Sequence, residues 1–228
     1  MNYFRRLWSD TRQILSTNTD LLVIAVITAL VLCIGRYHYL PIAGVSPEWR
    51  QVIIKLFRGA VILALPLLSV LALRIPLREL GFGWGKPKTW LRDIGLLFVI
   101  MLPVVFIVAH QPVFRRVYPY FRIARLGFGY FLISLGIHLV YLFCWEFLFR
   151  GYLLFGFKRK VGATAAIAIS TIPFVLMHFG KPVPELYGSI IAGIALGIVA
   201  VRARSFIPCV ILHFAVTSTL DIAAVLIS

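Results

Sequence analysis

The sequence predicts an all-α protein, a polytopic transmembrane helical bundle of about seven to eight spans. Of the 228 residues, 61% are hydrophobic and 14% are charged, whereas soluble domains are about 45–50% apolar and about 25% charged. The apolar residues form long runs, and basic residues cluster in the short stretches between them. No polar stretch is long enough for a separate soluble domain, so we expect one membrane domain.

The amino-terminal segment, residues 1–19, has a different pattern from the rest of the chain. Its apolar side chains, from Phe4 and Trp8 to Leu15, recur with helical spacing and so share one face. Most of its charged side chains lie on the other face. This pattern is typical of an amphipathic helix in the membrane interface. The integral membrane domain is expected to occupy residues 20–228.

Seven apolar runs follow, and each is a candidate span. Several contain a proline, which membrane helices tolerate because neighbouring helices can satisfy the freed carbonyl groups. Some are shorter than the roughly 20 residues that cross a bilayer, so packing among neighbours or local bilayer thinning must complete them. The runs are 20–40, 52–74, 93–110, 127–150, 162–179, 187–202 and 205–227.

Two local patterns predict connections and packing. The Gly- and Pro-rich segment 80–88 predicts a loop. In the run 187–202, Ser189, Gly193 and Gly197 recur every four residues and form a stripe along one helix face. Small residues in such a stripe let another helix approach closely.

The formal net charge is +15. The basic residues are scattered between apolar runs, which matches cytoplasmic loops and anionic headgroups rather than a nucleic-acid surface. We therefore expect membrane lipid as a partner and no nucleic acid. Most clusters of Lys and Arg fall on the cytoplasmic side if the amino terminus is cytoplasmic, although the basic cluster at 115–125 falls on the opposite side.

An acidic and a basic residue interrupt the apolar pattern of the fourth run. Glu146 and Arg150 follow the apolar stretch 128–144. A charge at the bilayer centre costs roughly 2.5–3.5 kcal/mol on insertion scales, so it calls for a partner or a task. Arg150 lies one helical turn beyond Glu146, so the two can face each other. A structural ion pair and a catalytic site both fit these two residues.

Further polar side chains lie at membrane depth on later runs. His178 follows Phe174 by one turn. His213 is followed after one turn by Thr217 and after two by Asp221, so the three form a slowly drifting stripe from which Asp221 could orient His213.

His138 lies on the same run as Glu146 but eight residues earlier. This spacing separates them by about 12 Å along a helix axis and by roughly 80° around it. We therefore expect His138 to pack or to support the site rather than to contact Glu146.

Glu146, His178 and His213 suit two kinds of hydrolytic site. Two histidines and a carboxylate can hold Zn²⁺ and leave a position open for water. Without a metal, Glu146 can accept a proton from water as general base while the histidines donate to the developing oxyanion. The residues leave both alternatives open. A transporter path for protons or anions is a third use of such residues, but no repeat symmetry supports it.

Three motifs occur in a fixed order along the chain. They are Glu-x-x-x-Arg-Gly at Glu146–Gly151, Phe-x-x-x-His at Phe174–His178, and His-x-x-x-small-polar at His213–Thr217. This order resembles the CAAX protease and bacteriocin-processing family of intramembrane endopeptidases, and the likeness spans about 128–219.

The resemblance implies a helical bundle with a cavity open toward the membrane and cleavage of a peptide bond in a membrane-associated protein or peptide. It implies that Glu146 activates water, that Arg150 holds this carboxylate, and that His178, His213 and Thr217 assist. Likeness to bacterial members implies the plasma membrane of a bacterium.

Two positions depart from the family pattern. The first motif usually reads Glu-Glu-x-x-x-Arg, and its first Glu is the one assigned as base; here Trp145 stands in that place. The last motif usually ends in Asn, and Thr217 keeps a donor and an acceptor but has a shorter reach. Either Glu146 has taken the role of the base through a shifted helix, or the protein is a non-catalytic binding or immunity protein of the same fold.

Overall fold

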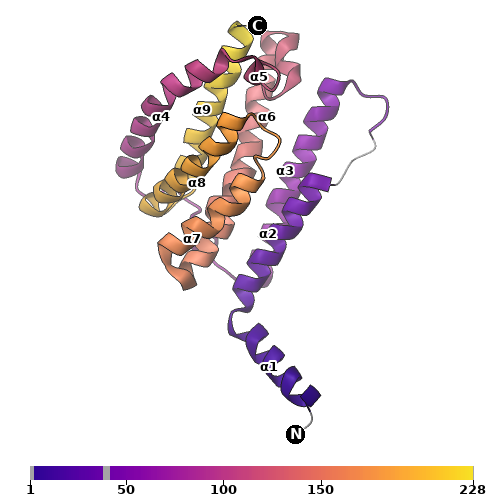
Figure 1. Cartoon of the computed structure of the whole chain (residues 1–228), viewed down its shortest axis with the longest axis vertical. Helices are drawn as coiled ribbons and strands as arrows, with labels where there is room; N and C mark the ends of the chain where they lie inside the picture. Colours follow the sequence, from indigo (N-terminus) through magenta and orange to yellow (C-terminus); the bar gives the residue numbers. More distant parts are fainter. Residues whose placement is uncertain (1–2, 38–41, 228) are drawn as a thin grey trace.

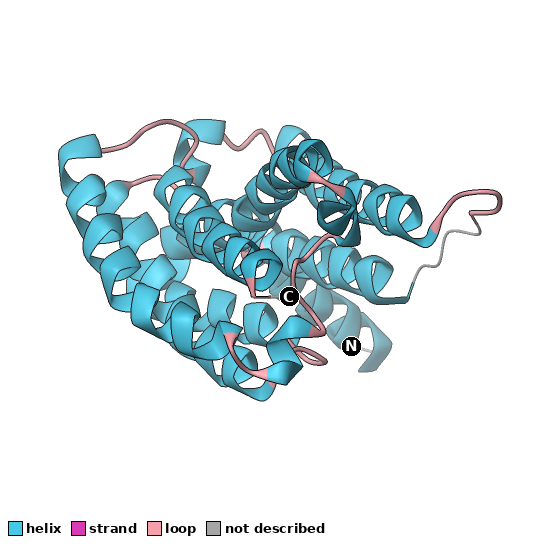
Figure 2. Cartoon of the chain, turned by 90° about the horizontal axis from the view of Figure 1, so that it is seen from above, coloured by secondary structure: helices cyan, strands magenta, loops and turns pink. Residues whose placement is uncertain are grey.

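The computed structural model describes residues 3–37 and 42–227, and every regular element in these ranges is a helix (Figure 1, Figure 2). The predicted end of the first span near residue 40 lies outside the described residues. The elements are α1 (Tyr3–Thr17), α2 (Thr19–Tyr37), α3 (Pro47–Ala72), the 3₁₀ helix η1 (Leu77–Leu80), α4 (Pro87–Ala109), α5 (Pro112–Arg115), the 3₁₀ helix η2 (Arg122–Leu126), α6 (Phe128–Glu146), the π-helix η3 (Phe147–Phe155), α7 (Gly156–Leu176), α8 (Val183–Ala203) and α9 (Ile207–Leu226).

Long apolar helices make the chain an integral multi-pass membrane protein. In the described ranges, six helical segments are long and apolar enough to cross a membrane. This is fewer than the predicted seven to eight because one segment of 49 residues, Phe128–Leu176, contains two of the predicted runs. Within this segment Gly162 has φ 80° and ψ 172°, a left-handed conformation that favours glycine. Two helices therefore meet at Gly162 rather than one helix continuing.

The chain reverses its direction after Gly162 (Figure 1). Arg159, before this turn, pairs with Asp20 at the start of α2 at 3.1 Å. Lys181, beyond the end of α7, has its Nζ 3.4 Å from the hydroxyl of Tyr118, which precedes α6. The start of α7 therefore lies at the end of the bundle that carries α1, called here the amino-terminal end. The end of α7 lies at the opposite end, called the far end.

The π-helix η3 is the centre of the bundle. It contacts α2, α3, α6, α7, α8 and η1. All nine of its residues are buried, including the fully buried Phe147, Leu148, Phe149 and Tyr152. A π-helix has a wider turn than an α-helix, and such turns recur at functional sites. Glu146 and Arg150 lie on either side of the junction between α6 and η3.

The predicted small-residue stripe lies where α8 packs on α7. A Cβ atom placed on Gly193 would lie 2.6 Å from Cγ2 of Thr171, and one on Gly197 would lie 3.0 Å from Cγ2 of Ile167. Ser189 is also buried. The prediction of a close helix approach along this stripe is confirmed.

The loop predicted at 80–88 is present at 81–86, between η1 and α4, and α4 already begins at Pro87. The loop packs at the amino-terminal end. The backbone N–H of Lys86 donates to the carbonyl of Ala203 at 3.1 Å, and the Ser205 hydroxyl donates to the carbonyl of Gly83. Gly85 has φ 58°, and a Cβ atom there would collide with the Ala203 carbonyl. The loop thus ties the start of α4 to the turn between α8 and α9.

Helix α1 extends away from the bundle (Figure 1). Phe4 is 78% exposed and Trp8 is 72% exposed, so the apolar face has little cover from the described protein. The helix itself is present where the sequence predicts it. Its position in the membrane interface stays a prediction.

The close contact of α7 and α8 predicts a specific response to substitution at Gly193. Gly193→Leu should lower the free energy of unfolding by about 1–3 kcal/mol, because the new side chain must displace Thr171 from the helix interface. Thermal unfolding of the purified protein in detergent measures this as a lower Tm. Gly188→Leu is the matched control on the same helix, since a Cβ atom there meets no heavy atom within 4 Å. Equal shifts in the two variants would contradict the packing described.

Candidate functional site

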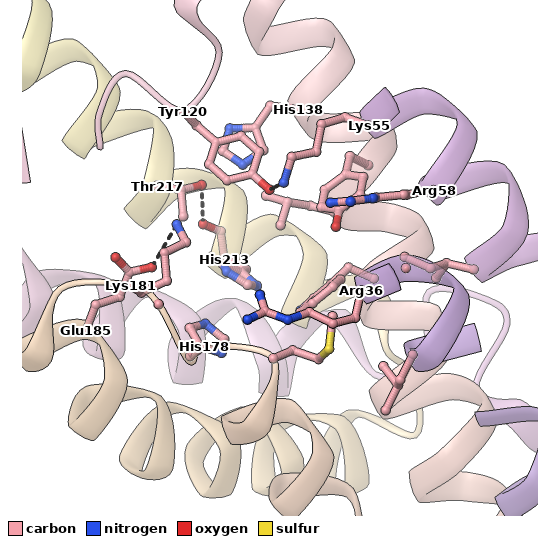
Figure 3. A pocket seen from close by; sticks show the side chains of 18 of the residues that line it. Arg36, Lys55, Arg58, Tyr120, His138, His178, Lys181, Glu185, His213 and Thr217 are labelled. Atoms are coloured by element: carbon pink, nitrogen blue, oxygen red, sulfur yellow. Dashed lines mark hydrogen bonds and ion pairs between the residues drawn. The ribbon is translucent and has the colours of Figure 1, made fainter. Parts of the chain in front are cut away.

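A cavity of about 540 Å³ lies between α2 and α3 on one side and α6, α9 and the turn after α7 on the other (Figure 3). Its polar lining falls into two groups. The histidine end contains Trp145, His178, His213 and Thr217. The basic end is defined by the cations Arg36, Lys55, Arg58 and Lys181.

Glu146 and Arg150 form an ion pair inside the protein. Glu146 is 0% exposed and Arg150 is 1% exposed. Nη1 of Arg150 donates to Oε1 of Glu146 at 3.3 Å and lies 3.1 Å from Oε2. The Arg150 guanidinium also lies 4.0 Å from the centre of the Phe174 ring, which favours a cation. The pairing predicted from the four-residue spacing is confirmed.

His213 connects this buried pair to the cavity. Its Nδ1 lies 2.6 Å from Oε1 of Glu146, which is a short hydrogen bond to a carboxylate. A carboxylate can only accept, so Nδ1 carries a proton, and in the neutral form of the ring Nε2 has a free lone pair. His213 lines the cavity, whereas the side chain of Glu146 does not. Glu146 therefore reaches the cavity through His213.

His178 has the same tautomer for a different reason. Its Nδ1 lies 2.8 Å from the carbonyl oxygen of Phe174, one turn earlier, which can only accept. Burial lowers the pKa of His178, so the ring is neutral at neutral pH. Its Nε2 then presents a lone pair and no proton. In this state His178 accepts hydrogen bonds, which differs from the expected donation to an oxyanion.

Thr217 and Trp145 complete the histidine end. The Thr217 hydroxyl donates to the carbonyl of His213 at 2.9 Å, within the same helix (Figure 3). Its proton is thus engaged, and Thr217 offers the cavity a hydroxyl oxygen as acceptor. The Trp145 ring is buried against Tyr141 and Phe149, with ring centroids 5.8 and 5.0 Å apart. It forms an apolar wall where a carboxylate stands in the family pattern.

Asp221 and His138 belong to a separate polar cluster. Oδ1 of Asp221 accepts from the backbone N–H of Tyr120 at 2.7 Å, and Oδ2 lies 3.4 Å from Nδ1 of His138. The His138 ring stacks on Tyr120 at 4.6 Å. The prediction that Asp221 orients His213 is therefore wrong, because the helix stripe drifts about 40° per turn and carries Asp221 toward α6. His138 does not contact Glu146, as expected.

The residues predicted as zinc ligands do not form a metal-binding group. Within the described ranges, no three His, Cys, Asp or Glu side chains lie together so that they could hold a metal ion. Oε1 of Glu146 faces Nδ1 of His213, so this carboxylate and the Nε2 of His213 point to different places. The set Glu146, His178 and His213 does not fit Zn²⁺.

The basic end contains site residues that the sequence did not reveal. Arg36, Lys55 and Arg58 lie near the ends of predicted spans, where Lys and Arg ordinarily reach toward the headgroups. Two features of the sequence point to these residues. Arg36 lies four residues inside the end of its predicted span, and Lys55 and Arg58 are three residues apart and therefore share one helix face. Their meeting across two helices depends on tertiary packing.

Part of this chain matches a protein-family model. Residues 127–219 match the family described as type II CAAX prenyl endopeptidase Rce1-like. No curated protein and no solved structure matches the chain. The matched segment contains all three motifs and the whole histidine end of the cavity. Residues 127–219 therefore match a domain of the Rce1-like type II CAAX prenyl endopeptidases, a peptidase family within the CAAX protease and bacteriocin-processing group that the motifs predicted.

Proposed function

We propose that this protein is an intramembrane endopeptidase that hydrolyses a peptide bond of a membrane-associated protein or peptide. The observation that carries the proposal is the 2.6 Å contact between Glu146 and His213 at the wall of a cavity. The arrangement holds the His213 ring in one tautomer, with Nε2 available to the cavity. In hydrolases of unrelated folds, a carboxylate that accepts a hydrogen bond from Nδ1 of a histidine fixes the tautomer and the orientation of its ring. Membership of residues 127–219 in a peptidase family supports the same reaction.

His213 would act as the general base. Its Nε2 accepts a proton from water as the water oxygen attacks the carbonyl carbon of the peptide. Glu146 stabilises the imidazolium that forms. When the C–N bond breaks, His213 returns this proton to the leaving amine nitrogen. The second proton of this water can be donated to Thr217 or to neutral His178, which would orient the water for attack.

Glu146 would therefore act through His213 and not directly on water. As direct base, it would have to leave both His213 and Arg150 and enter the cavity. Arg150 would hold the carboxylate in position, and Phe174 supports the guanidinium. This mechanism uses the same residues as the sequence predicts, but His213 rather than Glu146 contacts the water.

We place the protein in the membrane with seven crossings, counting α6 and α7 separately, in the plasma membrane of a bacterium. The amino terminus would be cytoplasmic, because the amino-terminal end carries the basic residues of α1, of the loop before α4 and of the α6–α7 turn. Residues 1–19 would lie in the interface as one unit, with 20–228 as the membrane domain.

Removing the proposed base should abolish most of the activity. His213→Ala in the protein reconstituted in liposomes should lower the cleavage rate of a membrane-tethered peptide library by about 10²–10⁴-fold. Mass spectrometry of the released fragments measures the rate. His110→Ala is the matched control, because His110 lies at the end of α4, outside the cavity. Undiminished cleavage by His213→Ala, with an intact Tm, would refute the role of His213.

A second candidate function is favoured by Trp145. This ring lines the cavity at the position of the family's usual base, and the acidic residue in the lining, Glu185, is paired with Lys181 at 3.2 Å. The protein would then bind a membrane peptide without cutting it, as an immunity protein of the same fold would.

The Trp145→Glu variant separates the two candidate functions. If the protein only binds, the wild type releases no fragments, and Trp145→Glu creates cleavage at least about tenfold above the background, because a cavity carboxylate supplies a general base. Trp145→Gln is the matched control, since it opens the same space without a base. Cleavage by the wild type would rule out the purely binding function.

A further inference from the structure

The basic end of the cavity holds more positive charge than the protein neutralises. Lys55 and Arg58 enter from α3, and Arg36 enters from α2 (Figure 3). Across the described ranges, no ion pair joins any of these three to a carboxylate. Lys181 is paired with Glu185 at 3.2 Å. Glu185 is also the single acidic residue among the residues that line the cavity.

The neighbours of these cations hold them without neutralising them. The Lys55 ammonium donates to the hydroxyl of Tyr120 and lies 4.5 Å from the centre of the Tyr120 ring and 5.3 Å from that of Tyr141. Nε of Arg58 is buried and has no hydrogen-bond partner in the described protein. Cation–π contacts orient an ammonium, but the net positive charge remains.

The net charge of the lining and the presence of two arginines indicate which anion the cavity would bind. The lining carries Arg36, Lys55, Arg58 and Lys181 against Glu185, which is four positive charges less one negative, or +3 with neutral histidines. A phosphate monoester brings about −1.5 to −2 at pH 7, whereas a carboxylate brings one charge. Arginine pairs with phosphate through two parallel N–H bonds. Phosphate matches this charge better than a carboxylate does.

The same cavity has an apolar wall beside the cations. Val31 and Leu32 of α2, Ile62 of α3 and Leu142 of α6 contribute to its lining. These residues belong to helical segments that are long and apolar enough to cross a membrane, so we expect the wall to lie at the depth of the acyl chains. A ligand that uses both parts must carry an anionic head on a hydrocarbon chain.

We propose that the cavity binds an amphiphile with a phosphate headgroup, its phosphate between Lys55, Arg58 and Arg36 and its chain along Val31, Leu32, Ile62 and Leu142. Such a ligand supplies the counter-charge that the described protein lacks at this end. Burial lowers the pKa of Lys181, its partner Glu185 opposes this shift, and the nearby Lys55 adds to it. The binding does not depend on peptide cleavage at the histidine end.

Binding of a defined lipid by the full-length protein tests this proposal. In neutral detergent, phosphatidic acid with one fluorescent acyl chain should bind, and the diacylglycerol with the same chains should bind at least tenfold more weakly. Arg58→Gln and Lys55→Gln should each weaken binding of the phosphatidic acid by about 10- to 100-fold, the loss of one charge-assisted hydrogen bond. Arg116→Gln is the matched control, because Arg116 is exposed near the far end and does not line the cavity.

Competition separates the other sources of an anion. Displacement of the probe by inorganic pyrophosphate as strongly as by unlabelled phosphatidic acid would show a site for a soluble anion and overturn the role of the chain. Displacement by a peptide with a free terminal carboxylate, but not by its amide, would assign the basic end to peptide substrates and overturn the lipid. Equal binding of diacylglycerol, or unchanged binding in Arg58→Gln with an intact Tm, would also overturn it.

A substitution at the histidine end distinguishes this proposal from the proteolytic one. His213→Ala should bind phosphatidic acid with the same Kd as the wild type, since His213 is not one of the cations that would hold the phosphate. A loss of binding in this variant would overturn the placement of the headgroup. Retained binding together with lost cleavage would support both proposals separately.

Discussion

The ion pair between Glu146 and Arg150 is the interaction on which the rest of the structure depends. Both side chains are completely enclosed, so each needs the other, and removing one partner of a buried pair typically costs about 3–5 kcal/mol. The pair lies where α6 passes into the π-helix η3, and η3 contacts most of the bundle. Holding Arg150 in place therefore orders the centre of the fold. Holding Glu146 in place fixes the ring of His213 at the cavity wall.

Much of the fold follows from patterns that act over one helical turn. The apolar runs, the loop before α4 and the close contact at Gly193 are all visible as periodicity or as residue size. The ion pair is equally local, because residues four apart share a helix face. The sequence also indicates the reversal at Gly162, because one predicted span ends at residue 150 and the next begins at residue 162.

The parts that sequence reasoning missed depend on geometry between helices. An assumed period of 3.6 residues cannot reveal a π-helix, so it gives no sign that η3 follows Glu146. The shared helix predicts that Asp221 orients His213, yet the partners of Asp221 are Tyr120 and His138, which come from other elements. The enclosure of Glu146 behind His213 likewise results from α9 packing on α6, which no single run encodes.

The two ends of the cavity come from different parts of the chain. The histidine end lies wholly within the matched family segment, residues 127–219. Three of the four cations at the basic end, Arg36, Lys55 and Arg58, come from α2 and α3, which precede that segment. Mutations in α2 and α3 can therefore change the basic end while the segment that matches the family stays unchanged. In evolutionary terms, the two ends of the cavity are free to diverge separately.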